Sequence, residues 1–153
     1  TLQDGAIPCG ASVAAYNMLR LGRLCERRDL EERAERFLSA HAEQFGRHPS
    51  AYAQSLIALD YALGEKSELV LCPGENGQSS DSMRDEVAGH FEPNLMIAEC
   101  RPGNRQLAEL LPLVEGKAAR RDRTTAYLCR GQSCREPVTD REALARQLEE
   151  GRR

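Results

Sequence analysis

The stretch DGAIPCGAS, residues 4–12, precedes the first run of helical character in this chain. Its two glycines permit backbone angles that other residues resist, and its proline fixes one angle, so the composition is that of a loop. The run of residues 12–25 is apolar nearly all round, which is typical of a helix buried on most sides. A loop in this position can hold a side chain rigidly at the end of a helical scaffold. We therefore expect any pocket with chemistry to lie here.

The composition is that of a soluble globular protein with room for one core or two small units. The chain has 153 residues, of which 41% are apolar and 29% are charged. A net charge of −3 provides no global basic field for binding nucleic acid. No apolar run approaches the roughly 20 residues that span a bilayer, and no basic leader precedes an apolar core. Because the first residue is Thr1 rather than Met, we expect a fragment of a longer, cytoplasmic protein.

The first part of the chain, as far as Gly64, has the pattern of three helices. The second helix is expected to begin at Asp29, which forms a capping box with Glu32. The third is expected to begin near Pro49, because proline suits a first helical turn. Gly64 fits the left-handed position that closes a helix. A buried, an outer and a buried helix in this order predict a fragment of an array of helical hairpins.

The second part, residues 65–153, alternates short apolar runs with helical patterns. Three of these runs predict strands, at residues 68–72, 94–98 and 124–129. Strands that alternate with helices predict right-handed crossovers and a small, three-stranded parallel sheet in a βαβαβα unit. The expected fold class is therefore mixed α and α/β, with helical hairpins followed by this unit.

Three helices are expected in the second part. One places Met83, Val87 and Phe91 on a single face. Another is ended or bent at Pro112, because proline disrupts a helix interior. The last begins with a capping box, residues 139–142.

The chain contains six cysteines, several of them inside apolar runs. Cys25 ends the first helix, and Cys72 and Cys100 each end a predicted strand. Their wide spacing favours reduced, buried thiols in a cytoplasmic protein over a disulfide framework. Cys129 and Cys134 bracket a turn-like stretch that could bring their α-carbons within the roughly 4.4–6.8 Å that a disulfide requires. A redox-active pair, a local structural pair and plain buried thiols all stay open for these two residues.

Three segments of the chain carry a family resemblance. Residues 4–15, DGAIPCGASVAA, are similar to a segment with the pattern DGAxPSGNSVAA. Residues 48–53, and the run from Thr125 through Cys134 to Pro137, resemble later segments of the same proteins in the same order. The family is a large one that includes the YyaL-like bacterial proteins and spermatogenesis-associated protein 20.

The resemblance implies a thioredoxin-like domain, then an (α/α)6 barrel similar to sugar epimerases and six-hairpin glycosidases, then a C-terminal tail. This chain would supply the terminal helices of the barrel, residues 1–64, and a small α/β C-terminal region, residues 65–153. The upstream thioredoxin-like domain would be its partner in the full-length protein. Where the family pattern has Ser and Asn, this chain has Cys9 and Ala11.

Asp4 and Asp60 are the candidate catalytic residues in such a barrel. The inner helices of a barrel point their first turns at a central pocket, and Asp4 lies just ahead of one of these helices. Asp60 is the only acid on the apolar surface of the third helix, and sugar chemistry needs an acid/base pair. Tyr16, Tyr52 and Cys9 are the candidate substrate-binding residues. The alternatives are a turn residue bonded to its own backbone for Asp4 and a charge at the helix rim for Asp60.

No cofactor or metal site is expected. Two cysteines without a nearby histidine do not make a zinc site, which needs four ligands. Residues 72–77 follow a predicted strand but lack the lysine and the glycine spacing of a P-loop. The basic run from Lys117 to Arg123 includes Asp122 and is expected to be a solvated loop rather than a phosphate site.

Two functional hypotheses follow. In the first, the chain is part of a sugar isomerase-like or hydrolase-like barrel that binds carbohydrate in the full-length protein and is inactive as a fragment. In the second, it is a non-catalytic scaffold, or a redox accessory region in which Cys129 and Cys134 serve the thioredoxin-like domain. Inner helices separated from their barrel would expose apolar faces, so we also expect the fragment to associate with itself. Neither hypothesis involves nucleic acid or a membrane.

Overall fold

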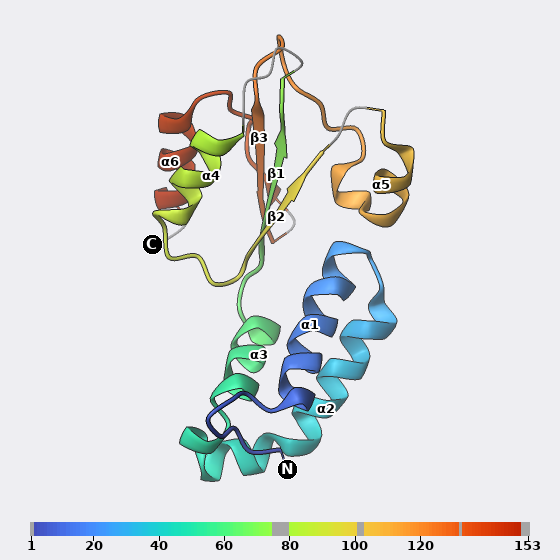
Figure 1. The fold of residues 1–153 in the computed structure, drawn as a ribbon, viewed down its shortest axis with the longest axis vertical. Coiled ribbons are helices and arrows are strands. Elements are labelled where there is room, and N and C mark those ends of the chain that lie inside the picture. Colours follow the sequence, from blue (N-terminus) through green and yellow to red (C-terminus); the bar gives the residue numbers. More distant parts are fainter. Residues whose placement is uncertain (1, 75–79, 101–102, 132, 151–153) are drawn as a thin grey trace. The chain divides into compact units, whose positions relative to one another are not determined.

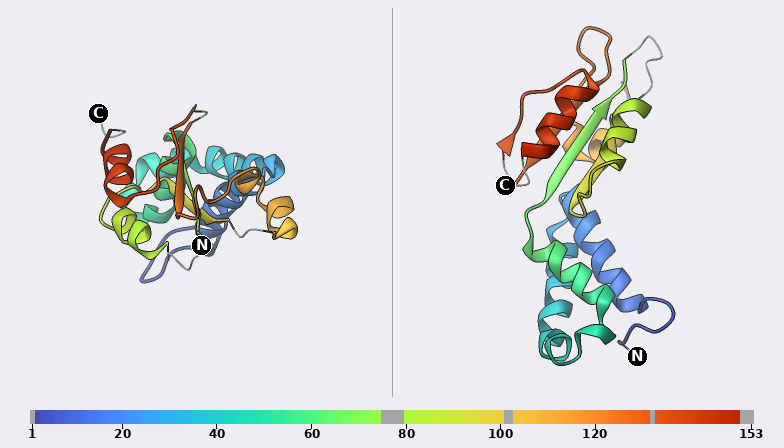
Figure 2. Two further views of the ribbon diagram at one scale, coloured as in Figure 1. Left: turned by 90° about the horizontal axis from the view of Figure 1, so that it is seen from above. Right: turned by 90° about the vertical axis from the view of Figure 1, so that its left-hand side faces the viewer.

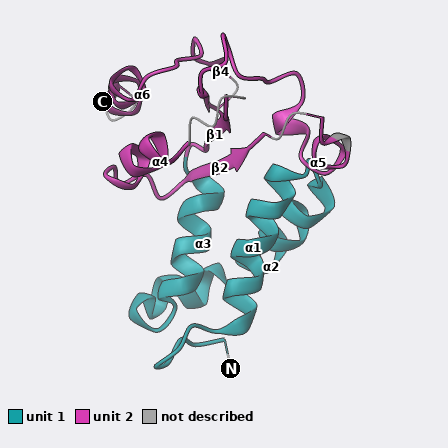
Figure 3. Ribbon diagram, turned by 45° about the horizontal axis from the view of Figure 1, so that its top comes forward, with its two compact units in different colours: residues 1–64 teal, residues 65–153 magenta. Residues whose placement is uncertain are grey.

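The computed structural model describes residues 2–74, 80–100, 103–131 and 133–150. The chain divides into two compact units, Thr1–Gly64 and Glu65–Arg153, which are coloured separately in Figure 3. Among the described residues, no helix is both long and apolar enough to cross a membrane. Most of the segment 72–77, which was weighed above as a phosphate loop, lies outside the described residues.

Unit 1 is helical, as the sequence predicted (Figure 1). Its elements are α1 (Gly10–Leu24), α2 (Arg28–Arg47), the short 3-10 helix η1 (Pro49–Ala51) and α3 (Ala53–Leu63). Helix α1 contacts both α2 and α3. The core of this unit is apolar and includes Ala15, Leu19, Leu38, Phe45 and Tyr61. These buried side chains stabilise the three-helix arrangement, and the described residues do not form a closed barrel.

Two details of the helix ends differ from the sequence prediction. Arg27, not Asp29, occupies the N-cap of α2, and its guanidinium donates to both carboxylate oxygens of Asp29, at 2.7 and 2.8 Å. The capping box at Asp29 was therefore wrong, because the ion pair engages the carboxylate. The left-handed position for Gly64 was also wrong. Its φ is −73° and its ψ 163°, so the chain leaves α3 in an extended conformation and continues toward the sheet.

Unit 2 contains a four-stranded sheet with the order β2-β1-β3-β4. The strands are β1 (Ser67–Cys72), β2 (Leu95–Glu99), β3 (Thr125–Arg130) and β4 (Ser133–Cys134). The first three were predicted, and β2 is parallel to β1 as expected. However, β3 is antiparallel to β1, and β4 is antiparallel to β3, so the sheet is mixed. The prediction of a wholly parallel, three-stranded sheet was wrong.

The segment before β3 returns the chain to the end of the sheet where β2 stops, so β3 runs antiparallel to β1. After β2 the chain forms α5 (Arg105–Leu110) and the 3-10 helix η2 (Pro112–Val114), so the predicted break at Pro112 is confirmed. A helix of six residues is only about 9 Å long. The segment starts and ends at the same end of the sheet. Cys100 lies beside the end of β1, and β3 begins with Thr125 opposite Cys72.

Helices cover both faces of the sheet (Figure 1). On one face, α4 (Asp81–Ala88) and α6 (Arg141–Glu149) contact each other and cover Leu69, Leu71 and Leu128 (Figure 2). On the other face, α5 and η2 cover the alternate residues of β1. This second cluster contains Val70, Cys72, Ala98, Cys100 and Val114.

The helix predictions in this unit hold except at two ends. Phe91 was expected to continue the apolar face of α4, but the helix ends at Ala88 and the Phe91 side chain is 83% exposed. Asp140, rather than Thr139, caps α6, because its carboxylate accepts a hydrogen bond from the Ala143 N–H at 2.8 Å.

Candidate functional site: the Asp4 clasp and the paired cysteines

The Asp4 side chain fastens the leading loop to the start of α3. One carboxylate oxygen accepts a hydrogen bond from the Cys9 N–H at 2.7 Å, and the other accepts from the Gln54 N–H at 2.8 Å. The Asp4 N–H in turn donates to the carbonyl oxygen of Ala51 at 2.8 Å. Gln54 lies in the first turn of α3, where backbone N–H groups have no partner within the helix. Asp4 therefore caps α3 from 50 residues away, and we call this set of bonds the Asp4 clasp.

Asp60 lies away from the clasp, near the C-terminal end of α3, and is exposed. The six positions between Gln54 and Asp60 correspond to about 9 Å along the helix axis. They also correspond to a rotation of about 240°, so the two positions face different directions. The structure does not bring Asp4 and Asp60 together as an acid/base pair within this chain. A catalytic role for either residue stays a prediction about the full-length protein.

The two candidate substrate-binding tyrosines pack within unit 1. The ring of Tyr16 meets the ring of Tyr61 edge-on at 5.6 Å, and its hydroxyl accepts a hydrogen bond from Arg20 at 3.2 Å. Tyr52 is buried, and its ring lies 5.2 Å from that of Phe45. Both contacts stabilise the helical core, and ligand binding by these tyrosines stays a prediction.

Cys9 occupies the N-cap of α1 and is largely buried. The N–H of Ser12, with help from that of Ala11 and from the Ser12 hydroxyl, lowers the pKa of the Cys9 thiol below its ordinary value. Burial acts in the opposite direction but does not cancel this effect. The hydroxyl of Ser12 lies 2.7 Å from that of Ser55, which joins α1 to α3 beneath the thiol. Cys9 is thus a thiol with a lowered pKa and little access to solvent.

Cys129 and Cys134 form a disulfide across the β3–β4 hairpin, with their α-carbons 3.9 Å apart. The two residues are directly paired between the strands, and Gly131 in the turn has a φ of 57°, which glycine adopts without strain. Cys129 is buried, whereas Cys134 is exposed. The sequence suggested the pair but missed β4, because two residues are too few to show a strand pattern. The geometry provides a disulfide between one buried and one exposed residue, and a redox role for this pair stays a prediction.

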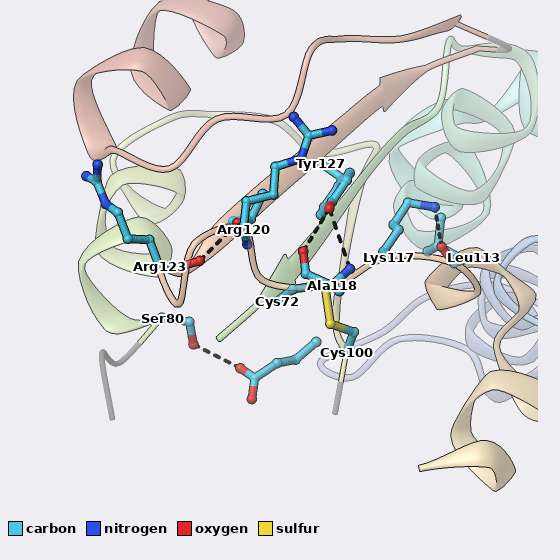
Figure 4. The surroundings of a disulfide bond; sticks show 11 residues. Cys72, Ser80, Cys100, Leu113, Lys117, Ala118, Arg120, Arg123 and Tyr127 are labelled. Atoms are coloured by element: carbon cyan, nitrogen blue, oxygen red, sulfur yellow. Dashed lines mark hydrogen bonds between the residues drawn. A yellow bond between two sulfur atoms is a disulfide. The ribbon is translucent and has the colours of Figure 1, made fainter. Parts of the chain in front are cut away.

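A second disulfide joins Cys72 to Cys100, at the ends of β1 and β2 (Figure 4). Their α-carbons are 4.9 Å apart, and both side chains are buried. The expectation of reduced thiols at these positions was wrong. The parallel register pairs Leu71 with Glu99, so the next residue of each strand falls beside the other. Two cysteines that each end a neighbouring predicted strand were the signal for this bond.

The remaining cysteines are not bonded in this way. Among the described residues, Cys9 and Cys25 are the cysteines outside the two disulfides. Within the same ranges, no group of three or more histidine, cysteine, aspartate or glutamate side chains is arranged to hold a metal ion.

The described residues form a helical segment and a small mixed sheet with a cross-strand cysteine pair, a class of structure typical of a part of a larger protein. Similarity to known proteins agrees with this class. The chain is 30% identical over 140 residues to spermatogenesis-associated protein 20 of Homo sapiens, and also to that of Rattus norvegicus. An uncharacterized protein of Caenorhabditis elegans is 25% identical over 136 residues. No family model and no solved structure matches the chain.

The chain is similar over most of its length to spermatogenesis-associated protein 20, as its three motifs predicted, which is consistent with a C-terminal part of such a protein. The match covers 90% of this chain but only 18% of the Homo sapiens protein. The chain therefore spans about a fifth of the length of its curated relatives.

Proposed function

We propose that this chain is a non-catalytic accessory region of a larger protein, and that its Cys129–Cys134 disulfide exchanges with a thioredoxin-type dithiol. The exposure of Cys134, opposite buried Cys129, is the observation that carries this proposal. The family resemblance supplies the partner, because it implies a thioredoxin-like domain upstream in the same protein.

The exchange is written as two thiol–disulfide steps. A partner thiolate attacks the Sγ atom of Cys134, the Cys129–Cys134 bond breaks, and the electron pair passes to the Sγ atom of Cys129. The second partner thiol, as its thiolate, then attacks the partner sulfur of the mixed disulfide and releases Cys134. The chain gains two electrons and two protons, and the partner dithiol becomes a disulfide. Attack starts at Cys134 because that sulfur belongs to the exposed residue.

The Cys72–Cys100 disulfide provides an internal comparison. Both of its cysteines are buried, at 0% and 5% exposure, under Val114 and its neighbours. A partner thiolate cannot reach either sulfur unless the structure opens. We therefore assign the Cys72–Cys100 bond a structural role and the Cys129–Cys134 bond the exchanging role.

Capture of the mixed disulfide tests the proposal. A thioredoxin that keeps only its attacking cysteine is expected to form a covalent adduct with the oxidised chain, and peptide mapping by mass spectrometry is expected to place the adduct at Cys134. The matched control, Cys134→Ser, should form none at this hairpin. The proposal fails if no adduct forms, or if it forms equally at Cys72 or Cys100.

A carbohydrate-processing barrel is the second candidate. The apolar side chains left exposed on α1 and α3, including Leu21, Ile57 and Leu63, favour it, because further helices of a larger array would cover them. These same side chains support the proposal that the isolated chain associates with itself. We rank this candidate second because both carboxylate oxygens of Asp4 already accept hydrogen bonds from backbone N–H groups.

A further inference from the structure

A polar cavity opens in unit 2 where α4 and α6 begin. Its volume is about 260 Å³. Its polar lining comes from the first turn of α4, the residues before β3 and the residues at the start of α6: Ser82, Arg123, Thr124, Thr139, Asp140 and Arg141. The cavity is unrelated to either disulfide and lies within a single unit, so its geometry does not depend on how the units are arranged.

Arg123 is held at this cavity by a tight turn. The Arg123 N–H donates to the carbonyl oxygen of Arg120 at 3.0 Å, and both central residues, Arg121 and Asp122, have positive φ values of 51° and 56°. Buried Thr125 fastens the turn, because its hydroxyl donates to the Arg123 carbonyl at 2.9 Å and accepts from the Arg120 N–H at 2.8 Å. The basic run is therefore a solvated turn, as the sequence predicted, and Thr125 anchors it.

Gly74 packs against this turn so closely that no side chain fits. A Cβ atom at position 74 would lie 2.0 Å from the carbonyl oxygen of Asp122. Contact between the backbones of Gly74 and Asp122 holds the turn close to the end of β1. In Figure 4 the Arg123 side chain extends away from the Cys72–Cys100 disulfide.

The positive charge of the Arg123 guanidinium is not paired with a carboxylate of the described residues. Its Nη2 atom donates to the carbonyl oxygen of Thr139 at 3.3 Å, and no carboxylate of the described residues lies within ion-pairing distance of it. The other two charged side chains of the lining are already engaged. Arg141 pairs with Glu86 at 2.5 Å, and one oxygen of Asp140 caps α6 through the Ala143 N–H.

We propose that this cavity binds a small phosphate-bearing ligand such as a phosphate monoester, with Arg123 as the principal contact. A guanidinium presents several N–H donors in a planar fork that matches two oxygens of a phosphate group. The Ser82 and Thr139 hydroxyls line the same cavity and can donate to a third oxygen. A carboxylate offers only two oxygens and would leave these hydroxyl donors unused. The cavity, at about 260 Å³, is larger than a phosphate group, so part of the ligand beyond the phosphate would also lie inside it.

Titration of the complete chain with inorganic phosphate tests this site, with backbone amide NMR shifts as the readout at constant ionic strength. Saturable shifts are expected at Ser82, Thr139 and neighbouring residues. Arg123→Gln should weaken phosphate binding at least tenfold. The matched control is Arg121→Gln, which removes a guanidinium from the same turn but not from the cavity lining and should leave the affinity within about twofold of the parent.

Acetate, added at the same concentrations, separates phosphate recognition from attraction of any anion. It is expected to cause no saturable shift at these residues. The proposal is overturned if phosphate gives no saturable shifts, if the two arginine variants lose affinity equally, or if acetate binds as tightly as phosphate. None of these results bears on disulfide exchange at Cys134, so the two proposals can fail separately.

Discussion

Replacing Cys72 and Cys100 together by alanine is expected to lower the free energy of unfolding of unit 2 by about 3–4 kcal/mol. The bond closes a loop with a sequence separation of 28 residues, and a cross-link of that span removes many conformations from the unfolded chain. The alanines also remove buried sulfur atoms from the cluster beneath α5. Guanidinium denaturation followed by circular dichroism measures the change.

The Cys129→Ala, Cys134→Ala double variant is the matched control. Its bond spans only 5 residues, so the same relation predicts a smaller loss of about 2 kcal/mol. Fully reducing conditions break both bonds, so the reduced parent chain should be less stable than the oxidised Cys72, Cys100 variant by about the same 2 kcal/mol. A loss for the Cys72, Cys100 variant that is equal to or smaller than that of the control would contradict the structural role of the longer cross-link.

Asp4→Ala is expected to destabilise unit 1 by about 2–3 kcal/mol. The change leaves the N–H groups of Cys9 and Gln54 without their acceptor, and one of these belongs to the first turn of α3. Asp4→Asn keeps one acceptor oxygen and should cost about 1 kcal/mol. Urea denaturation monitored by helical circular dichroism provides the free energies.

Asp60→Asn is the control for this prediction, because an exposed side chain outside the clasp should change the stability by less than about 0.5 kcal/mol. The same variants separate the two functional candidates in the full-length protein. A catalytic Asp4 would lose carbohydrate turnover in Asp4→Asn far beyond the small loss of stability. If Asp4 serves only in the clasp, Asp4→Asn should lose no more turnover than its loss of stability explains. An Asp4→Ala variant that is as stable as the parent would contradict the clasp.

Much of the fold could be predicted from local patterns. Apolar periodicity located the helices and three of the strands, since each pattern reports the face that one element buries. Strand direction could not be predicted in this way. It depends on the end of the sheet at which the chain arrives after the α5–η2 segment, and no local pattern contains that information.

The candidate site was harder to predict because its partners are distant in sequence. Asp4 was singled out for its position before a helix, but its role is set by Gln54, which is 50 residues away. The Cys72–Cys100 bond likewise required the parallel register of β1 and β2, which no local pattern contains. Cys129 and Cys134 were found because a turn of few residues joins them.

The Arg123 cavity illustrates the same limit. The sequence showed a basic run but not the turn at Arg121 and Asp122, because neither residue is the glycine or asparagine that usually marks positive φ values. The close approach of Gly74 to this turn depends on the sheet, which brings the two segments together.

The most direct test of disulfide exchange is a comparison of the two bonds in one sample. The oxidised chain is incubated with catalytic thioredoxin and its reductant, and newly formed thiols are alkylated with an isotopic label and quantified by mass spectrometry. We predict that label accumulates at Cys129 and Cys134 while Cys72 and Cys100 stay bonded. Label appearing first at Cys72 and Cys100, or at all four cysteines at the same rate, would contradict exchange at the exposed hairpin.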